Sequence, residues 1–164
     1  MTKPLWAPWR MEFITCEKKE GSCVFCELPK EKEDNKNLIL YQGKTVFVIL
    51  NKFPYNLGHM MVVPFEHISR FELLKKEQLI EMMQESQRAM QVLTDVYNPD
   101  GFNMGMNLGQ VAGAGIKDHL HFHIVPRWNG DTNFMPVLAE TKAMPEHLQT
   151  CFEKCFEGYR RRLK

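Results

Sequence analysis

The most constraining feature of this sequence is a short segment in which histidines alternate with large apolar residues. Residues 119–124 read His-Leu-His-Phe-His-Ile. Strict alternation is the period of a β-strand, in which side chains two residues apart share one face. The apolar residues Leu120, Phe122 and Ile124 are therefore expected to pack into a core. The pattern predicts a strand that presents three imidazole rings on its other face.

Three interpretations of this imidazole row are open. The histidines can be structural and hydrogen-bonded, or they can hold a metal, because two histidines two residues apart on a strand commonly share a zinc ion. They can also perform nucleophilic or acid–base chemistry on a phosphate, since imidazole has an ordinary pKa of about 6.5. The small residues of Ala112-Gly113-Ala114-Gly115 lie just before the row and let a phosphate approach the backbone closely. We favour the phosphate chemistry.

Composition narrows the class of protein. A chain of 164 residues is expected to form one domain with a substantial core. No apolar run approaches the roughly 20 residues that span a bilayer, and the first residues lack the apolar core of a signal peptide, so we expect a cytoplasmic protein without a membrane partner. The formal net charge of +1 argues against binding a nucleic-acid polymer.

The remaining patterns predict an α+β domain, with an antiparallel sheet of about five strands, one long central helix and a C-terminal helix. The expected elements are strands at 38–41, 46–50, 59–64, 102–109 and the histidine segment, a helix at 75–97 and a final helix that starts at Pro145. Core positions on the two helices, chosen by their helical spacing, are Leu79, Met83, Met90, Leu93, Tyr97, Cys151 and Cys155.

A second chemical motif is the pair Cys23-Val24-Phe25-Cys26. A C-x-x-C pair is half of a zinc site, a redox dithiol, or two buried free thiols. Redox pairs of the thioredoxin type occupy a strand–helix junction in a βαβ pattern, which this stretch does not show. A zinc site needs two further ligands elsewhere in the chain.

The segment His-Leu-His-Phe-His-Ile-Val at 119–125 resembles the signature of the histidine-triad (HIT) superfamily, in which each histidine is followed by an apolar residue. The resemblance extends from about Trp6 to Met135 and is closest to the bacterial branch of diadenosine tetraphosphate (Ap4A) phosphorylases and hydrolases. It implies a HIT-like fold in one domain over 1–164, with an N-terminal arm at 1–22, a HIT core at 23–136 and a helical segment at 137–164. The segments that indicate this branch are Leu5-Trp6-Ala7-Pro8-Trp9-Arg10, Ala112-Gly113-Ala114-Gly115 and Pro126-Arg127-Trp128.

The resemblance also implies catalytic roles. His121 is expected to attack an α-phosphorus and to form a nucleotidyl-histidine, while His123 and His59 stabilise charge on the phosphoryl oxygens. Asn51 is expected to bind ribose hydroxyls and Asn107 a ribose or phosphate. Backbone N–H groups at Ala114 and Gly115 are expected to bind phosphate.

Family members with the N-terminal cysteine pair complete a structural zinc site with two histidines. By resemblance the ligands here are Cys23, Cys26, His67 and His119. No organic cofactor is expected. The implied partners are a nucleotide or dinucleoside polyphosphate substrate and a second copy of the chain, because the family forms homodimers.

One departure from the family pattern bears on the reaction. Many HIT hydrolases carry a Gln or a Ser/Thr pair shortly before the first triad histidine, whereas this chain has Gly115-Ile116. The smaller residue leaves space for a phosphate acceptor, so phosphorolysis and hydrolysis stay open. Two rival functions are also open: a nucleoside phosphoramidase, and a zinc-stabilised nucleotide-binding module with little catalysis.

Overall fold

The computed structural model describes residues 23–132 and 144–163. The predicted N-terminal arm at 1–22 and the segment 133–143 lie outside the described residues. The elements in chain order are α2 (Val24–Glu27), η1 (Leu28–Glu31), β1 (Ile39–Gln42), β2 (Val46–Leu50), β3 (Met60–Pro64), η2 (Phe71–Leu73), α3 (Lys76–Tyr97), β4 (Gly101–Gly105), η3 (Gln110–Ala112), β5 (Phe122–Arg127) and α5 (Leu148–Arg162).

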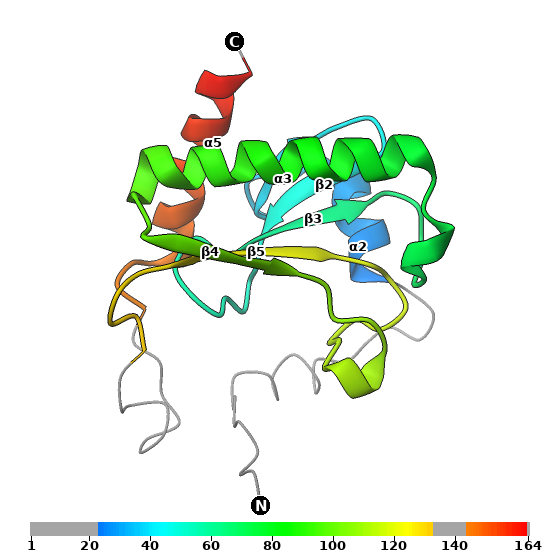
Figure 1. Ribbon diagram of the computed structural model, residues 1–164. Coiled ribbons are helices and arrows are strands. Elements are labelled where there is room, and N and C mark those ends of the chain that lie inside the picture. The colour runs from blue at the N-terminus through cyan, green and yellow to red at the C-terminus, as the bar shows by residue number, and fades with distance from the viewer. Residues whose placement is uncertain (1–22, 133–143, 164) are drawn as a thin grey trace, which may run out of the picture.

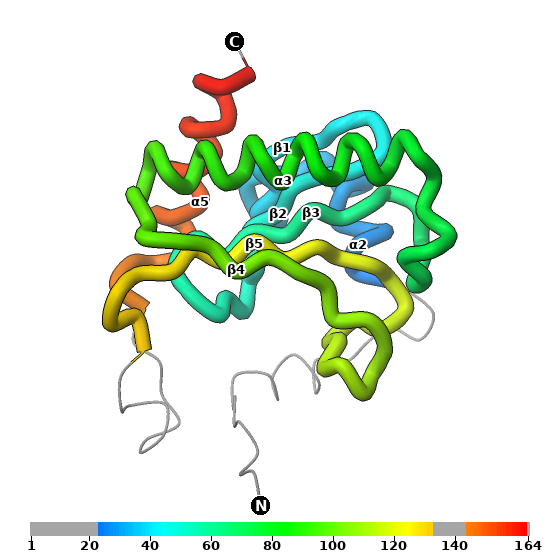
Figure 2. Tube along the Cα trace, in the orientation of Figure 1, coloured from blue at the N-terminus to red at the C-terminus, as the bar shows by residue number. Residues whose placement is uncertain are grey.

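Within the described residues the strands form one five-stranded sheet in the order β1-β2-β3-β5-β4, and every pair is antiparallel. Helix α3 connects β3 to β4 and runs across one face of the sheet, and α5 packs beside it (Figures 1 and 2). This arrangement confirms the predicted α+β class. It also leaves the opposite face of β5 to carry His123.

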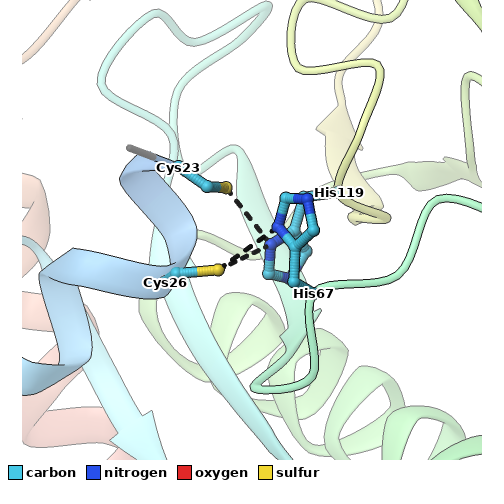
Figure 3. Close-up of side chains that lie close together, drawn as sticks. All are labelled: Cys23, Cys26, His67 and His119. Carbon is cyan, nitrogen blue, oxygen red and sulfur yellow. Dashed lines mark hydrogen bonds between the residues drawn. The ribbon is translucent and has the colours of Figure 1, made fainter. Parts of the chain in front are cut away.

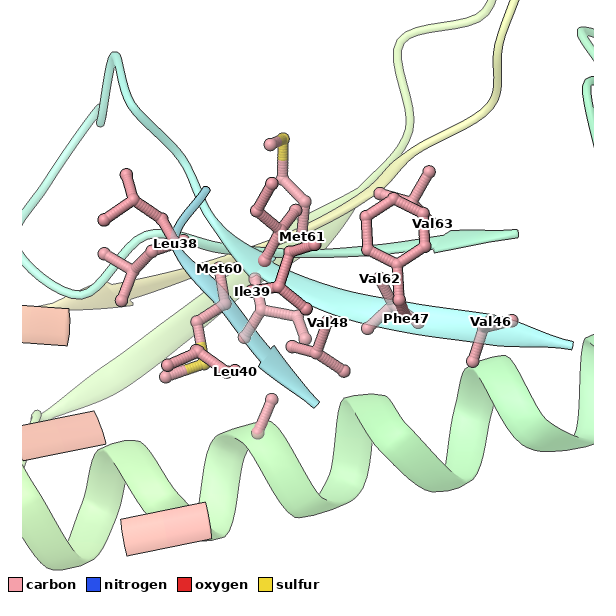
Figure 4. Close-up of a cluster of buried hydrophobic side chains, with 14 of the residues drawn as sticks. Leu38, Ile39, Leu40, Val46, Phe47, Val48, Met60, Met61, Val62 and Val63 are labelled. Atoms are coloured by element: carbon pink, nitrogen blue, oxygen red, sulfur yellow. The ribbon is translucent and has the colours of Figure 1, made fainter. Parts of the chain in front are cut away.

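The centre of the sheet is buried on both faces. All residues of β2 and β3 are buried, which agrees with their uninterrupted apolar sequences. In Figure 4, Val46 and Val48 point toward α3, whereas Phe47 and Met61 point to the other face. Each such side chain contributes about 1.5–3 kcal/mol when it is fully buried. These two strands form the buried centre of the sheet, next to the candidate site.

A half-buried carboxylate ties α3 to the turn between β1 and β2. Glu81 accepts hydrogen bonds from the backbone N–H groups of Lys44 and Thr45, each at 2.7 Å, and from the Thr45 hydroxyl. The turn approaches α3 so closely here that a Cβ added to Gly43 would collide with Glu81 Oε1. Glu81 therefore fixes the register of α3 on the sheet.

Several sequence expectations are corrected. Met83 is 46% exposed, because the buried face of α3 is centred on Met82, Ala89 and Leu93. Strand β4 ends at Gly105 and β5 begins at Phe122, so Asn107 and two of the triad histidines lie outside the strands. Helix α5 begins at Leu148, not at Pro145. In both strand segments the alternation of polar and apolar residues in the sequence extends beyond the residues that pair in the sheet.

Candidate active site and metal centre

The sheet register places His123 on the face opposite α3. Its partners in the register are Met61 on β3 and Gly105 on β4, and residues paired in this way present their side chains to the same face. A Cβ added at Gly105 would meet no atom within 4 Å. Open space therefore lies beside His123, on the side where β4 supplies no side chain.

His121 is held in a single tautomer. Its Nδ1 atom lies 2.9 Å from the backbone oxygen of His119, and a carbonyl oxygen can only accept a hydrogen bond. Nδ1 therefore carries the proton and Nε2 carries the lone pair. Burial lowers the pKa of His121, which keeps the ring neutral near pH 7. An imidazole in this state is prepared to act as a nucleophile through Nε2.

His59 and His123 form a second oriented pair. The backbone N–H of Tyr55 donates to Nδ1 of His59 at 3.0 Å, so the proton of the neutral His59 ring is on Nε2. That Nε2 lies 2.9 Å from Nδ1 of His123, which must then accept. The proton of His123 is consequently on its own Nε2. The ring of His123 is thus oriented as a hydrogen-bond donor, 4.8 Å between ring centroids from His121.

Asn51 lies at the end of β2 and contacts this pair. Its Nδ2 atom is 3.3 Å from Nδ1 of His59, and its Oδ1 accepts the backbone N–H of Phe53 at 2.9 Å. The second contact is an Asx turn that fixes the start of the loop between β2 and β3. Asn51 therefore helps to hold His59 as well as offering polar atoms to a ligand.

The predicted metal ligands come together from three separate segments (Figure 3). Cys23 Sγ is 3.3 Å from Nδ1 of His119, and Cys26 Sγ is 3.3 Å from Nδ1 of His67 and 3.5 Å from Nδ1 of His119. The four ligand atoms all lie within 4.8 Å of one another. Tetrahedral zinc requires S–N separations of about 3.5 Å, given its ordinary bond lengths. The group has the size of a tetrahedral zinc site.

The surroundings of the four residues also fit a metal. The Nε2 atom of His119 donates to the backbone oxygen of Pro64 at 2.8 Å, which directs the Nδ1 lone pair toward the cysteines, as in many metal-bound histidines. Burial and the neighbouring Cys23 raise the pKa of Cys26 to about 11. A bound cation would lower that pKa again, because metals take cysteine as the thiolate.

The loop that precedes β5 carries the other predicted ligand-binding residues. Asn107 is half-buried and lies just beyond the end of β4. The backbone N–H of Ala114 donates to the backbone oxygen of Gly109 at 3.3 Å, so this group is engaged within the loop. Gly115 is exposed. A phosphate contact at Ala114 would replace the bond to Gly109.

Two aromatic residues contact the histidines without having been predicted. The Phe25 ring packs against His119 and His121, at centroid distances of 5.5 Å and 5.3 Å. The Tyr55 ring lies 4.6 Å from that of His59. Phe25 stands inside the C-x-x-C pair, and Tyr55 is four residues before His59. Nothing in the spacing of either indicates a ring contact, because the sheet and the loop bring the rings together.

Comparison with known proteins agrees with this geometry. The model of the HIT domain family matches residues 32–130. The chain is 39% identical over 153 residues to a protein of Mycobacterium tuberculosis named "AP-4-A phosphorylase", covering 88% of this chain and 78% of that protein. The chain belongs to the HIT family. The predicted family is confirmed.

Solved structures of HIT proteins share the fold. A hypothetical histidine-triad nucleotide-binding protein of Sulfolobus tokodaii aligns with a TM-score of 0.66 at 26% identity, over 85% of this chain and 90% of that one. A zinc-bound histidine-triad protein of Mycobacterium smegmatis aligns with a TM-score of 0.68 at 23% identity, over 85% and 94%. Among the described helices of this chain, none has the length and apolar character to cross a membrane.

Proposed function

We propose that this chain is a nucleotide-binding enzyme that cleaves dinucleoside polyphosphates such as Ap4A at an α-phosphate. The main support is the pair of fixed tautomers: an Nε2 lone pair on His121 lies beside an Nε2–H on His123. Such a pair serves attack at phosphorus and donation to a phosphoryl oxygen at the same time. The relative named "AP-4-A phosphorylase" supports this class of substrate.

The reaction we propose has two displacements. In the first, Nε2 of His121 forms a bond to the α-phosphorus, and the bond from that phosphorus to the bridging oxygen of the leaving nucleotide breaks. His123 and His59 stabilise charge on the phosphoryl oxygens, and Asn51, Asn107, Ala114 and Gly115 bind the ribose and phosphates. In the second, water or inorganic phosphate displaces His121 and releases the nucleotide. Burial keeps His121 neutral for the first step.

We propose that the metal is zinc and that its role is structural. Two sulfur and two imidazole ligands at tetrahedral separations favour zinc. His119 contributes its ring to this group and its backbone oxygen to His121. When bound, zinc would hold Cys23, Cys26, His67 and His119 together and leave the transfer chemistry to the other histidines. We propose no organic cofactor.

The proposal extends to the organisation of the protein. We propose one HIT domain with the core at 23–136, flanked by an arm at 1–22 and a helical segment at 137–164. A homodimer is supported by edge strand β4, where Met104 is 43% exposed, since exposed apolar edges favour pairing with another chain. None of the described cysteines forms a disulfide, which suits the reducing cytoplasm that we propose as the location of the protein.

The direct test is Ap4A turnover with and without inorganic phosphate, with the products separated and identified. ADP plus ATP formed only with phosphate would establish phosphorolysis, and AMP plus ATP formed without phosphate would establish hydrolysis. The variant His121→Asn is expected to lose both activities while keeping the melting temperature of the wild type. Turnover by His121→Asn at the wild-type rate would contradict the nucleophile.

Two other HIT-type functions are outcomes of the same experiment. Release of AMP from an adenosine phosphoramidate, with no cleavage of Ap4A, would support the phosphoramidase. Binding of AMP to the wild type without turnover of either substrate would support the nucleotide-binding module. The oriented His59–His123 pair favours catalysis, because binding alone requires no ordered series of imidazole protons.

A further inference from the structure

A network of polar contacts lies beyond the far end of β5 and is absent from the mechanism above. Its centre is the Asp131 carboxylate, whose side chain is 8% exposed. Arg127 holds this carboxylate with two hydrogen bonds, from Nε at 2.6 Å and from Nη2 at 2.9 Å. The third Arg127 nitrogen donates to Asn103 on β4 at 2.6 Å. A bidentate pair of this kind is geometrically specific.

The same carboxylate reaches across to the loop that joins β2 to β3. Nδ2 of Asn56 donates to Asp131 Oδ2 at 2.7 Å and to the backbone oxygen of Pro126 at 3.0 Å. Asn56 is buried, with 7% of its surface exposed. Figure 2 shows this loop beside the end of β5. One side-chain amide therefore attaches the β2–β3 loop to the strand that carries His123.

The backbone groups of Asn56 and its neighbour Tyr55 hold His59 in place. The backbone oxygen of Asn56 accepts the N–H of His59 at 3.2 Å, and the N–H of Tyr55 donates to Nδ1 of the same ring at 3.0 Å. The position of the loop consequently sets both the tautomer of His59 and its distance from His123. A shift of the loop by about 1 Å is enough to cost roughly 100-fold in rate.

The charge state of Asp131 suits this task. The hydrogen bonds from Arg127 hold the pKa of the Asp131 carboxyl well below its usual range, so it is a carboxylate throughout the neutral range. A carboxylate accepts several hydrogen bonds at once, which lets it bind Arg127, Asn56 and the backbone N–H of Trp128 together. An amide in its place could not accept all of them.

We propose that Asp131 and Asn56 are positioning residues that orient the His59–His123 pair for the transfer reaction. The inference rests on the proposed function for its kinetic consequence, but the orientation of the rings is a property of the protein alone. Asp131 holds the side chain of Asn56. Asn56 in turn fixes the loop backbone, whose N–H at Tyr55 and oxygen at Asn56 bind His59. Neither side chain is required to touch the substrate.

The kinetic test compares Asp131→Asn with Asp100→Asn. Asp100 is a matched control, because its carboxylate accepts the N–H of Asn129 at 2.7 Å, two residues before Asp131, while none of the hydrogen bonds in the described part of the chain joins it to Asn56. We expect Asp131→Asn to lower kcat about 10- to 100-fold with KM changed less than about threefold. Asp100→Asn should leave both constants near wild type. Equal kinetic constants in the two variants would overturn the proposal.

A pair swap tests the contact itself. Asn56→Asp sets two carboxylates against each other and should lower kcat at least as much as Asp131→Asn. The double variant Asn56→Asp/Asp131→Asn removes this repulsion and restores one donor and one acceptor between the two positions, although the Pro126 backbone oxygen still lacks its donor. We expect it to recover at least tenfold in kcat over Asn56→Asp alone. No recovery would contradict the coupling.

A spectroscopic readout separates this inference from the proposed function. Long-range ¹H–¹⁵N correlation spectra report which nitrogen of each imidazole is protonated. The wild type should show His59 and His123 as Nε2–H tautomers, and Asp131→Asn should show a mixture for His59. That change without turnover of any substrate would refute the proposed function alone. Unchanged tautomers and kcat in all folded variants, including the milder Arg127→Lys, would refute the positioning role.

Discussion

The backbone oxygen of His119 lies 2.9 Å from Nδ1 of His121, while the ring of His119 takes part in the group with Cys23 and Cys26. One residue therefore belongs to the proposed metal centre through its side chain and to the proposed active site through its main chain. The pKa of His119 is lowered by burial, so its ring is neutral and suited to ligate a cation. Loss of a ligand from the proposed metal centre should for this reason disturb the orientation of His121.

Removal of a metal ligand should reduce both stability and catalysis. We expect Cys26→Ser to lose bound zinc, to lower the melting temperature by several degrees and to lower kcat. Elemental analysis, thermal melts and Ap4A turnover measure the three effects. Cys155→Ser is the control, because Cys155 is buried in the core and should change stability without changing metal content. A Cys26→Ser protein that retains a full equivalent of zinc would contradict the ligand assignment.

Loss of the His59 ring should affect kcat more than KM. In the variant His59→Gln, Nδ1 of His123 loses the donor that lies 2.9 Å away, so His123 is free to adopt the other tautomer. We expect kcat to fall roughly 100-fold, a usual effect of a lost acid–base group. The control is His147→Gln, at an exposed position. An unchanged kcat in His59→Gln would exclude an oriented proton on His123 from the reaction.

The contact between Glu81 and the β1–β2 turn should stabilise the fold without affecting catalysis. The substitution Glu81→Ala leaves the N–H groups of Lys44 and Thr45 without their acceptor. We expect the free energy of unfolding to fall by about 1–3 kcal/mol, measured by urea denaturation, and kcat to stay within about twofold. The substitution Glu77→Ala, at an exposed position of the same helix, should change the unfolding free energy by less than about 0.5 kcal/mol.

The buried carboxylate of Glu85 on α3 should make the protein less stable as pH rises. Burial raises the pKa of Glu85 above its ordinary value of 4.5, and Glu85 Oε2 has no hydrogen-bond partner in the described part of the chain. The raised pKa means that the folded state resists ionisation, so the cost is absent below pH 4.5 and grows as pH rises through the folded pKa.

The substitution Glu85→Gln removes that charge and keeps the shape of the side chain. We expect the variant to be more stable than wild type by roughly 1 kcal/mol at pH 7.5 and equal to it at pH 4. Denaturant unfolding at the two pH values tests both statements. A variant that is less stable at pH 7.5 would show that the pair with Arg88, 3.6 Å away, outweighs the burial of the carboxylate.

The sequence by itself determined the elements that depend on local periodicity. Strand β2 matched the predicted range 46–50, and α3 was placed to within one residue, at Lys76–Tyr97. Both are long, uninterrupted patterns, so the residues that form the element also carry its signal. The histidine row and the C-x-x-C pair were readable for the same reason. Only the family resemblance indicated that His67 and His119 complete a site with the two cysteines, because no local pattern links either histidine to the C-x-x-C pair.

Only the tertiary structure decided which nitrogen of each imidazole carries the proton. The tautomers of His121, His119 and His59 depend on the backbone atoms of His119, Pro64 and Tyr55. Strand register and loop shape set those distances, and neither is a property of residue type. The contact between Asn56 and Asp131 joins positions 75 residues apart. Local pattern carries no information about such a pair, because folding brings its two residues together only after the sheet has formed.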